Sequence, residues 1–265
     1  MQEIDKLRTE FFANISHELR TPLNIIISAL QVIKSFNNCS YTKDRSFKYL
    51  KSIKQNSFRL LRLINNLIDL TKIDGGYFKI HPTNHNIVSI VEDITLSVAE
   101  YAENKSLTLT FDTNTEERIM SCDADKIERI MMNLISNAIK FTDPGGHIFI
   151  SLLDKTDHVI ISVKDTGIGI PKSDLDIIFE RFRQVNKSSE RNYVGSGIGL
   201  SLVKSLVELH GGNISVNSTY GEGTEFIINL PVTINPNSTV SKEDTDFSKN
   251  NIQKINIEFS DIYPR

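Results

Sequence analysis

Apolar residues recur every three or four positions along the first quarter of the chain. Between residues 3 and 36 they form one stripe: Ile4, Leu7, Phe11, Ile15, Leu19, Leu23, Ile26, Leu30 and Ile33. This period predicts one long amphipathic helix. After a polar loop at residues 37–42, a second stripe of the same period runs from Leu50 to Leu67 and stops before Asp74-Gly75-Gly76. The two stripes predict a helical hairpin over residues 1–75.

The hairpin has more apolar surface than its two helices can bury against each other. In a symmetric dimer, two such hairpins can bury it by forming a four-helix bundle. The alternative is that the hairpin packs against the C-terminal part of its own chain. The hydrophobic pattern fits both arrangements.

From Tyr77 the pattern becomes mixed. Alternating segments predict strands at residues 107–111, 147–153, 159–164 and 225–230. Segments of helical period predict helices at residues 87–101, 125–140 and 199–210. Because strands and helices do not follow a strict βαβ order, we expect an α/β sandwich over residues 76–232. The fold class is therefore α + α/β, a helical hairpin followed by an α/β sandwich.

The last segment, residues 233–265, begins with a polar linker. Near its end Ile255, Ile257 and Phe259 alternate with polar residues. This alternation predicts a C-terminal strand that docks on a sheet edge or in a hydrophobic groove. A disordered tail is the alternative.

Composition limits the class of protein. A length of 265 residues is enough for two domains. The net charge of -3 does not suggest a nucleic-acid partner. No run of about 18 apolar residues and no signal peptide is visible. Cys39 and Cys122 are far apart, without metal-type spacing, so we expect a reduced, cytoplasmic protein.

His17 is the first candidate for chemistry. A lone histidine on a helix is usually an ordinary surface or core residue. Here Glu18 follows directly, and Thr21 lies one helical turn further on the same face. Pro22 lacks an N–H, so the Glu18 carbonyl loses its helical partner and a bend is expected beyond the histidine.

Asn133 and Asn137 are four residues apart on a predicted helix, so their amides share a face. An amide oxygen is a suitable ligand for Mg²⁺, and Lys140 lies near enough to reach a phosphate. By itself this spacing is weak evidence, since two solvated amides would look the same.

Asp165-Thr-Gly167-Ile-Gly169 follows a predicted strand directly. The carboxylate can accept a hydrogen bond from an adenine amino group, and the glycines allow the backbone to approach the base. A turn with a capping aspartate is the alternative. Gly221 to Thr224 predicts a tight turn that leads into the last strand of the sandwich.

The run from Gly195 through Gly197 and Gly199 to Leu200 precedes a predicted helix. Backbone N–H groups there can hold phosphates. A dinucleotide fold would need a buried strand immediately before the glycines, but a polar loop precedes them instead. That loop, residues 184–194, follows Phe179 and Phe182 and predicts a flexible lid with an aromatic hinge, or else an ordinary surface loop.

Bacterial sensor histidine kinases carry five sequence motifs in a fixed order, called the H, N, G1, F and G2 boxes. Segments of this chain resemble them in the same order, over residues 1 to about 232. The H box lies around His17, the N box at Asn133 and Asn137, the G1 box at Asp165, Gly167 and Gly169, the F box at Phe179 and Phe182, and the G2 box at Gly195, Gly197 and Gly199. The resemblance implies a dimerisation and histidine-phosphotransfer hairpin, and then a Bergerat-type ATP-binding domain. It implies ATP and Mg²⁺ as cofactors, with Asn137 holding the metal. The implied nucleotide-binding residues are Asn133, Asn137, Lys140, Phe141, Asp165, Gly167, Gly169, Phe179, Phe182, Gly195, Gly197, Gly199, Leu200 and Thr224.

The resemblance also implies roles near the histidine. His17 would attack the γ-phosphorus of ATP, and Glu18 would accept its proton as a general base. Thr21 would help to position water when the regulator is dephosphorylated, although it can also be a plain polar residue of the helix.

The implied partners are a second copy of the chain and the receiver domain of a separate response regulator. A sensor domain is expected upstream in a longer protein. Membrane segments outside this sequence can anchor that longer protein. Two other functions stay open. A gyrase-like ATPase is disfavoured because Asn133 stands where those enzymes have a catalytic glutamate. A degenerate kinase that acts as a scaffold would keep the fold without transferring phosphate.

Overall fold

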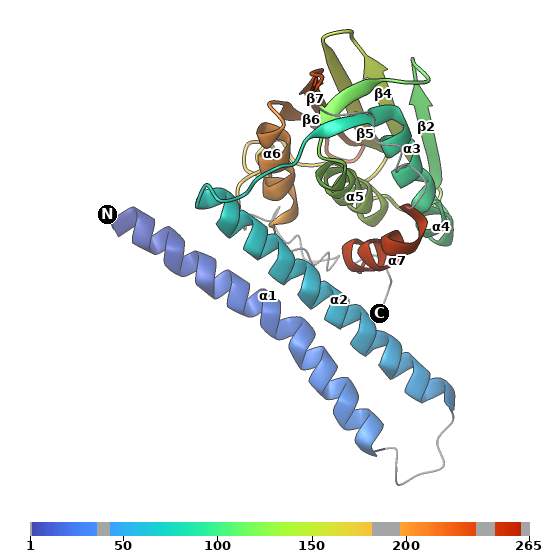
Figure 1. Cartoon of the computed structure of the whole chain (residues 1–265). Coiled ribbons are helices and arrows are strands. Elements are labelled where there is room, and N and C mark those ends of the chain that lie inside the picture. The colour runs from blue at the N-terminus through green and yellow to red at the C-terminus, as the bar shows by residue number, and fades with distance from the viewer. Residues whose placement is uncertain (1, 36–42, 182–196, 237–246, 261–265) are drawn as a thin grey trace.

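The computed structural model describes residues 2–35, 43–181, 197–236 and 247–260. A long helical hairpin lies along one side of an α/β domain, and the second hairpin helix is the nearer of the two to that domain (Figure 1). The predicted loop at residues 37–42 and the predicted lid at residues 184–194 lie outside the described residues.

The hairpin consists of α1 (Gln2–Ser35) and α2 (Lys43–Asp74), as the apolar stripes predict. Pro22 lies inside α1, where it is buried. Glycines end α2: the Gly75 and Gly76 N–H groups donate to the carbonyls of Thr71 and Ile73, and Gly76 has a φ of 70°. A left-handed residue that follows the last turn is a common helix stop.

A five-stranded sheet forms the centre of the second domain, in the order β2-β4-β5-β7-β6. The pair β2/β4 is parallel and the other three pairs are antiparallel. The strands are β2 (Thr108–Thr113), β4 (His147–Asp154), β5 (His158–Asp165), β6 (Asn213–Thr219) and β7 (Gly223–Pro231). The helices are α3 (Ile87–Ser97), α4 (Ala99–Asn104), α5 (Ala124–Phe141) and α6 (Gly199–Leu209). The predicted fold class, a hairpin followed by an α/β sandwich, is confirmed.

Buried residues alternate with exposed or half-buried ones along β4 and with half-buried ones along β7, as expected for a sheet with one covered face. The covering layer is helical: α3 contacts β2 and β4, α5 contacts β5, and α6 contacts β6. Lys105 stabilises the end of α5, because its Nζ donates to the Ile139 and Lys140 carbonyls at 2.6 and 2.8 Å.

Some elements differ from the predictions. The helix predicted at residues 87–101 is interrupted at Val98, which separates α3 from α4. Two short strands, β1 (Thr83–Asn86) and β3 (Ile119–Cys122), pair with each other outside the main sheet. Neither was predicted, because four residues are too few to show a clear alternation.

The predicted C-terminal strand is wrong. Residues 247–258 form the helix α7 (Phe247–Glu258), which contacts α2 and α5. Ile255 and Phe259 are one helical turn apart and both are buried. Apolar residues four positions apart fit a helix as well as a strand, and here packing decides for the helix. Among the described helices, none has the length and apolarity that crossing a membrane requires.

Candidate functional site

His17 is exposed on α1, about halfway along the helix. The neighbouring Glu18 is half-buried, and its Oε2 lies 3.8 Å from Nη2 of Arg59 on α2. Thr21 donates its hydroxyl hydrogen to the His17 carbonyl at 3.2 Å. The histidine is therefore accessible, and a cation from the second helix restrains the carboxylate beside it. The sequence gives no signal for Arg59, because this contact depends on how α1 and α2 pack.

The segment around Asn133 and the glycine run before α6 meet in the structure. Asn133 is 1% exposed on α5, and its Oδ1 makes no hydrogen bond among the described residues. A Cβ placed on Gly199 would lie 2.4 Å from this oxygen. Any side chain at residue 199 would therefore collide with the asparagine. Asn137, one turn further along α5, is half-buried.

The two asparagines fit a magnesium site. Mg²⁺ takes oxygen ligands and is commonly held by a few protein groups together with phosphate oxygens. Within the described part of the chain, the Asn133 Oδ1 is a buried acceptor without a donor, and such a group is costly unless a ligand satisfies it.

Asp165 ends β5 and is 6% exposed. Its Oδ1 accepts a hydrogen bond from the Gly167 N–H at 2.8 Å, and the carboxylate also accepts one from the Thr224 backbone. Burial raises the pKa of Asp165 to about 6, against the lowering effect of these two hydrogen bonds. Thr224 is the strand partner of Asp165 across β5 and β7, so the sheet brings two predicted site segments together.

Close backbone packing requires the glycines after Asp165. A Cβ at Gly167 would lie 2.5 Å from the Phe141 carbonyl oxygen. At Gly169, whose φ is 64°, it would lie 2.1 Å from the Thr219 carbonyl oxygen. The end of α5, with half-buried Lys140 and Phe141, therefore lies directly against the Asp165 segment.

The remaining predicted residues are only partly described. Phe179 packs edge-on against Phe226 of β7, with 6.3 Å between ring centroids, so it contributes to the core. Gly197 has a φ of 65°, and Leu200 packs against the core. Phe182 and Gly195 lie outside the described residues.

We expect the affinity for ATP to fall as the pH drops through about 6. Asp165 is a carboxylate above its raised pKa of about 6 and can then accept the adenine amino hydrogen bond. Below that pH it is protonated and is a weaker acceptor. Calorimetric titration with ATP from pH 5 to 8 tests this expectation. The Asp165→Asn variant should bind ATP more weakly than the parent at pH 8, and its affinity should not show the fall near pH 6. Since ATP itself titrates in this range, the difference between the two profiles is the measurement. Parallel profiles would contradict the role of Asp165.

Two family models match the chain. Residues 7–76 match the His Kinase A (phospho-acceptor) domain, and residues 122–234 match the histidine kinase-, DNA gyrase B-, and HSP90-like ATPase. Together they cover the hairpin and most of the α/β domain. The chain belongs to the histidine kinase family.

Two curated relatives are identical to this chain at more than a third of the aligned positions. Hybrid signal transduction histidine kinase D of Dictyostelium discoideum is 38% identical over 96% of the chain and 16% of that protein. Sensor histidine kinase WalK of Bacillus subtilis is 36% identical over 87% of the chain and 38% of that protein. The chain thus spans well under half the length of either relative.

Solved histidine kinases share the fold. Histidine kinase ThkA, in a crystal structure with the response regulator protein TrrA, has a TM-score of 0.64 and 24% identity. That match covers 88% of the present kinase and 64% of the ThkA chain. Acinetobacter baumannii histidine kinase AdeS has a TM-score of 0.63 and 22% identity, over 82% of this chain and 98% of that one.

The ATP-binding domain of the kinase is joined to the hairpin by polar contacts that the sequence does not reveal. Arg129 on α5 pairs with Asp69 on α2, and it donates to the Asn66 Oδ1 at 2.6 Å. Arg181 pairs with Asp74 at the end of α2. These contacts are properties of the tertiary arrangement, since each partner is one charged or polar residue among many on a helix surface.

Proposed function

We propose that the chain is an ATP-dependent protein-histidine kinase that phosphorylates its own His17 and passes the phosphoryl group to an aspartate of a response regulator. One observation carries this proposal: an exposed histidine on a phospho-acceptor hairpin is joined, in one chain, to an ATPase domain in which the segments predicted to bind nucleotide lie close together. The regulator partner is supported by the ThkA structure, which contains response regulator TrrA.

The transfer starts with an unprotonated ring nitrogen of His17, which attacks the γ-phosphorus of ATP. A nitrogen–phosphorus bond forms, the bond to the bridging oxygen breaks, and ADP leaves with the electron pair of that bond. Glu18 accepts the proton from the other ring nitrogen as a general base, and Arg59 holds the carboxylate in place. The phosphohistidine then loses its phosphoryl group to the receiver aspartate.

Residues of the second domain hold ATP. Asp165 accepts from adenine, and the backbone around Gly197 and Gly199 cradles the phosphates at the start of α6. Lys140 reaches a phosphate from the end of α5. Asn137, beside Asn133, would hold Mg²⁺, which when bound would neutralise part of the phosphate charge. An amide at position 133 cannot act as a general base for water, which favours phosphoryl transfer over the gyrase-like hydrolysis of ATP.

Incubation of the chain with γ-labelled ATP tests the proposal. The chain should gain a label that is stable in alkali and labile in acid, as a phosphoramidate is. A chain that binds ATP but gains no label would be a scaffold.

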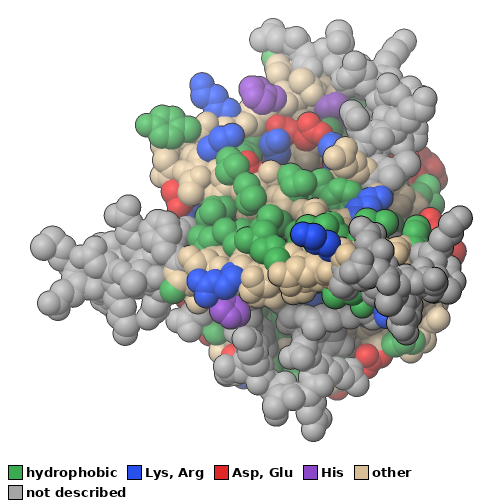
Figure 2. All heavy atoms as spheres, turned by 90° about the horizontal axis from the view of Figure 1, so that it is seen from below, with side chains coloured by type: hydrophobic (Ala, Val, Ile, Leu, Met, Phe, Trp, Pro, Cys, Tyr) green, Lys and Arg blue, Asp and Glu red, His purple; other side chains and the backbone are tan. Residues whose placement is uncertain are grey.

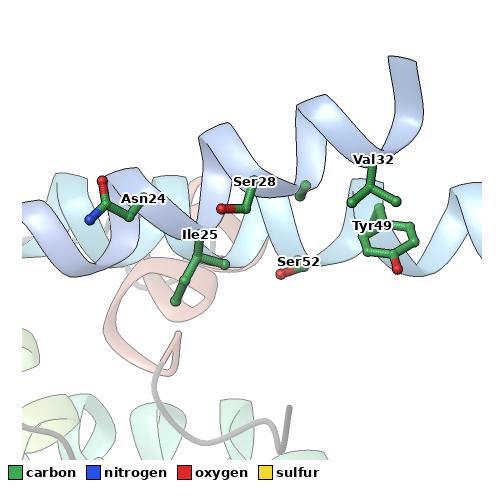
Figure 3. Close-up of a pocket in the computed structure, with 7 residues that line it drawn as sticks. Asn24, Ile25, Ser28, Val32, Tyr49 and Ser52 are labelled. Carbon is green, nitrogen blue, oxygen red and sulfur yellow. The ribbon is translucent and has the colours of Figure 1, made fainter. Parts of the chain in front are cut away.

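We further propose that the hairpin forms a homodimer. Large apolar residues are exposed on both hairpin helices: Leu23, Ile27, Leu30, Phe47, Leu50, Leu61, Ile64 and Ile68. Figure 2 shows hydrophobic side chains gathered across the face seen from below, the side on which the hairpin lies. A hollow of about 300 Å³ lies between the two helices, lined by residues such as Ile25, Ser28 and Tyr49 (Figure 3). Its lining contains no predicted site residue and none of the exposed apolar residues named above, so the hollow is not part of the proposed dimer face.

The finer proposal is that the kinase also dephosphorylates its regulator, with Thr21 positioning water. Replacing Thr21 with alanine removes the hydroxyl, together with its bond to the His17 carbonyl. Histidine phosphorylation should stay within about twofold of the parent, because a net hydrogen bond of this kind contributes only about 1 kcal/mol to stability. Loss of phosphate from a labelled regulator should slow at least tenfold, as the release of labelled phosphate would show. Equal slowing of both reactions would mean that Thr21 only supports α1.

A further inference from the structure

The C-terminal helix α7 connects the hairpin to the nucleotide-binding domain. It lies beyond residue 234, where the ATPase family match ends. Figure 1 shows α7 beside α2 and α5, and it contacts both helices. The proposed reaction assigns it no role.

On the hairpin side, two residues of α2 hold the end of α7. Arg62 Nη1 donates to the Glu258 carbonyl at 2.5 Å, and its Nε lies 3.4 Å from the Glu258 carboxylate. Gln55 donates from its side-chain amide to the Ser260 carbonyl at 2.9 Å. These contacts therefore fix the position of the last turn of α7 along α2 of the phospho-acceptor hairpin.

On the other side, one lysine joins α7 to α5. Lys254 Nζ donates to Asp125 at 2.9 Å and to Glu128 at 2.7 Å. Glu128 is 2% exposed, and burial raises its pKa although Lys254 acts to lower it. A buried carboxylate without its cation is costly, so Lys254 stabilises the docked position of α7.

An aromatic contact completes the docking. Phe259 is fully buried, with its ring centroid 4.8 Å from that of Tyr101 on α4. Burial of the phenylalanine ring stabilises the docked helix. The interface is therefore apolar at its end as well as ionic along its length.

The decisive contact is between Glu258 and Asn133. The Asn133 Nδ2 lies 3.5 Å from Glu258 Oε2, while the Oδ1 of the same amide faces Gly199. The Asn133 amide thus lies between the Glu258 carboxylate and Gly199, one of the glycines that we propose to bind the ATP phosphates. In the docked position, α7 holds the Glu258 carboxylate, which is paired with Arg62, beside the place proposed for the ATP phosphates.

We propose that α7 is an autoinhibitory latch, which opposes binding of the ATP triphosphate through Glu258 and pins the ATP-binding domain to α2. The inference rests on the proposed function for the identity of the nucleotide. Release of α7 frees the Asn133 amide and Arg62. It also removes one set of contacts between the domain and α2, beside those of Arg129 and Arg181. Nucleotide and α7 compete, so each weakens the binding of the other by the same factor.

The first test measures affinity in the full chain. Glu258→Gln keeps the size of the side chain and removes its charge, and Lys254→Ala releases α7 from α5. Each should tighten binding of a non-hydrolysable ATP analogue by about 3- to 10-fold, the range expected if the open state makes up roughly 0.1–0.3 of the molecules. The control Lys155→Ala removes an exposed lysine at the end of β4 and should change nothing. Weaker or unchanged binding in Glu258→Gln overturns the latch, even if Lys254→Ala fails to fold.

The second test uses hydrogen–deuterium exchange and needs no phosphoryl transfer. Adding the same analogue with Mg²⁺ should speed amide exchange in residues 253–260, because bound nucleotide releases the helix. Slower or unchanged exchange at saturating analogue would show that α7 supports the nucleotide-bound form, and would overturn the proposal. If both tests succeed but no phosphohistidine forms from ATP, the latch stands and the proposed kinase reaction fails.

Discussion

Replacement of His17 by glutamine is expected to reduce autophosphorylation below detection while leaving ATP affinity unchanged. Glutamine is close to histidine in size but has no nucleophilic ring nitrogen, so no nitrogen–phosphorus bond can form. ATP binding should persist because the segments predicted to bind the nucleotide lie on α5, β5 and α6, whereas His17 lies on α1. Labelling with γ-labelled ATP and titration with an ATP analogue give the two readouts.

A second histidine provides the matched control. His147 is exposed at the start of β4 and lies beside Phe149, with 6.0 Å between ring centroids. His147→Gln should label like the parent chain, so that loss of label can be assigned to position 17 rather than to histidine content. Normal labelling of His17→Gln would show that another residue is the phosphoryl acceptor.

Sequence patterns predicted the parts of the fold that depend on interactions between residues close together in the sequence. The hairpin follows from a long 3.6-residue period, and the strands that precede and follow the predicted nucleotide site follow from alternation. The segment at Asp165 was predictable because glycines mark positions where the backbone must come close, and the structure shows contacts at Gly167 and Gly169 that leave no room for a Cβ. The roles of these residues in binding ATP remain predictions.

What could not be predicted depends on long-range packing. The apolar spacing of Ile255, Ile257 and Phe259 fits a strand or a helix, and the choice depends on the surfaces of α2 and α5 against which α7 packs. The pairs Glu18–Arg59 and Arg129–Asp69 join residues 41 and 60 positions apart, with nothing local to match them. The link between hairpin and ATP-binding domain was therefore the least visible part of the candidate site.

Replacement of Gly169 by alanine is expected to abolish ATP binding and to destabilise the second domain. The loop after Asp165 is joined to the β6–β7 turn, because the Ile170 N–H donates to Ser218 and the Gly221 N–H donates to the Ile168 carbonyl, both at 2.8 Å. A Cβ at residue 169 would lie 2.1 Å from the Thr219 carbonyl oxygen, so the loop and the turn would have to separate. Left-handed backbone costs roughly 1–2 kcal/mol for alanine, and overpacking adds about 1–3 kcal/mol.

Gly145→Ala separates these two costs. Gly145 also has a positive φ, 87°, but its Cβ would meet nothing within 4 Å. Gly145→Ala should lower the free energy of unfolding by the backbone cost alone, about 1–2 kcal/mol, and should leave ATP binding intact. Gly169→Ala should lower the free energy of unfolding by roughly 2–5 kcal/mol, as chemical denaturation would measure. Equal losses in the two variants, with ATP binding intact in both, would mean that the loop can relax away from Thr219. In that case close packing at Gly169 would not be what shapes the predicted adenine site, and the case for that site would rest on the buried carboxylate of Asp165.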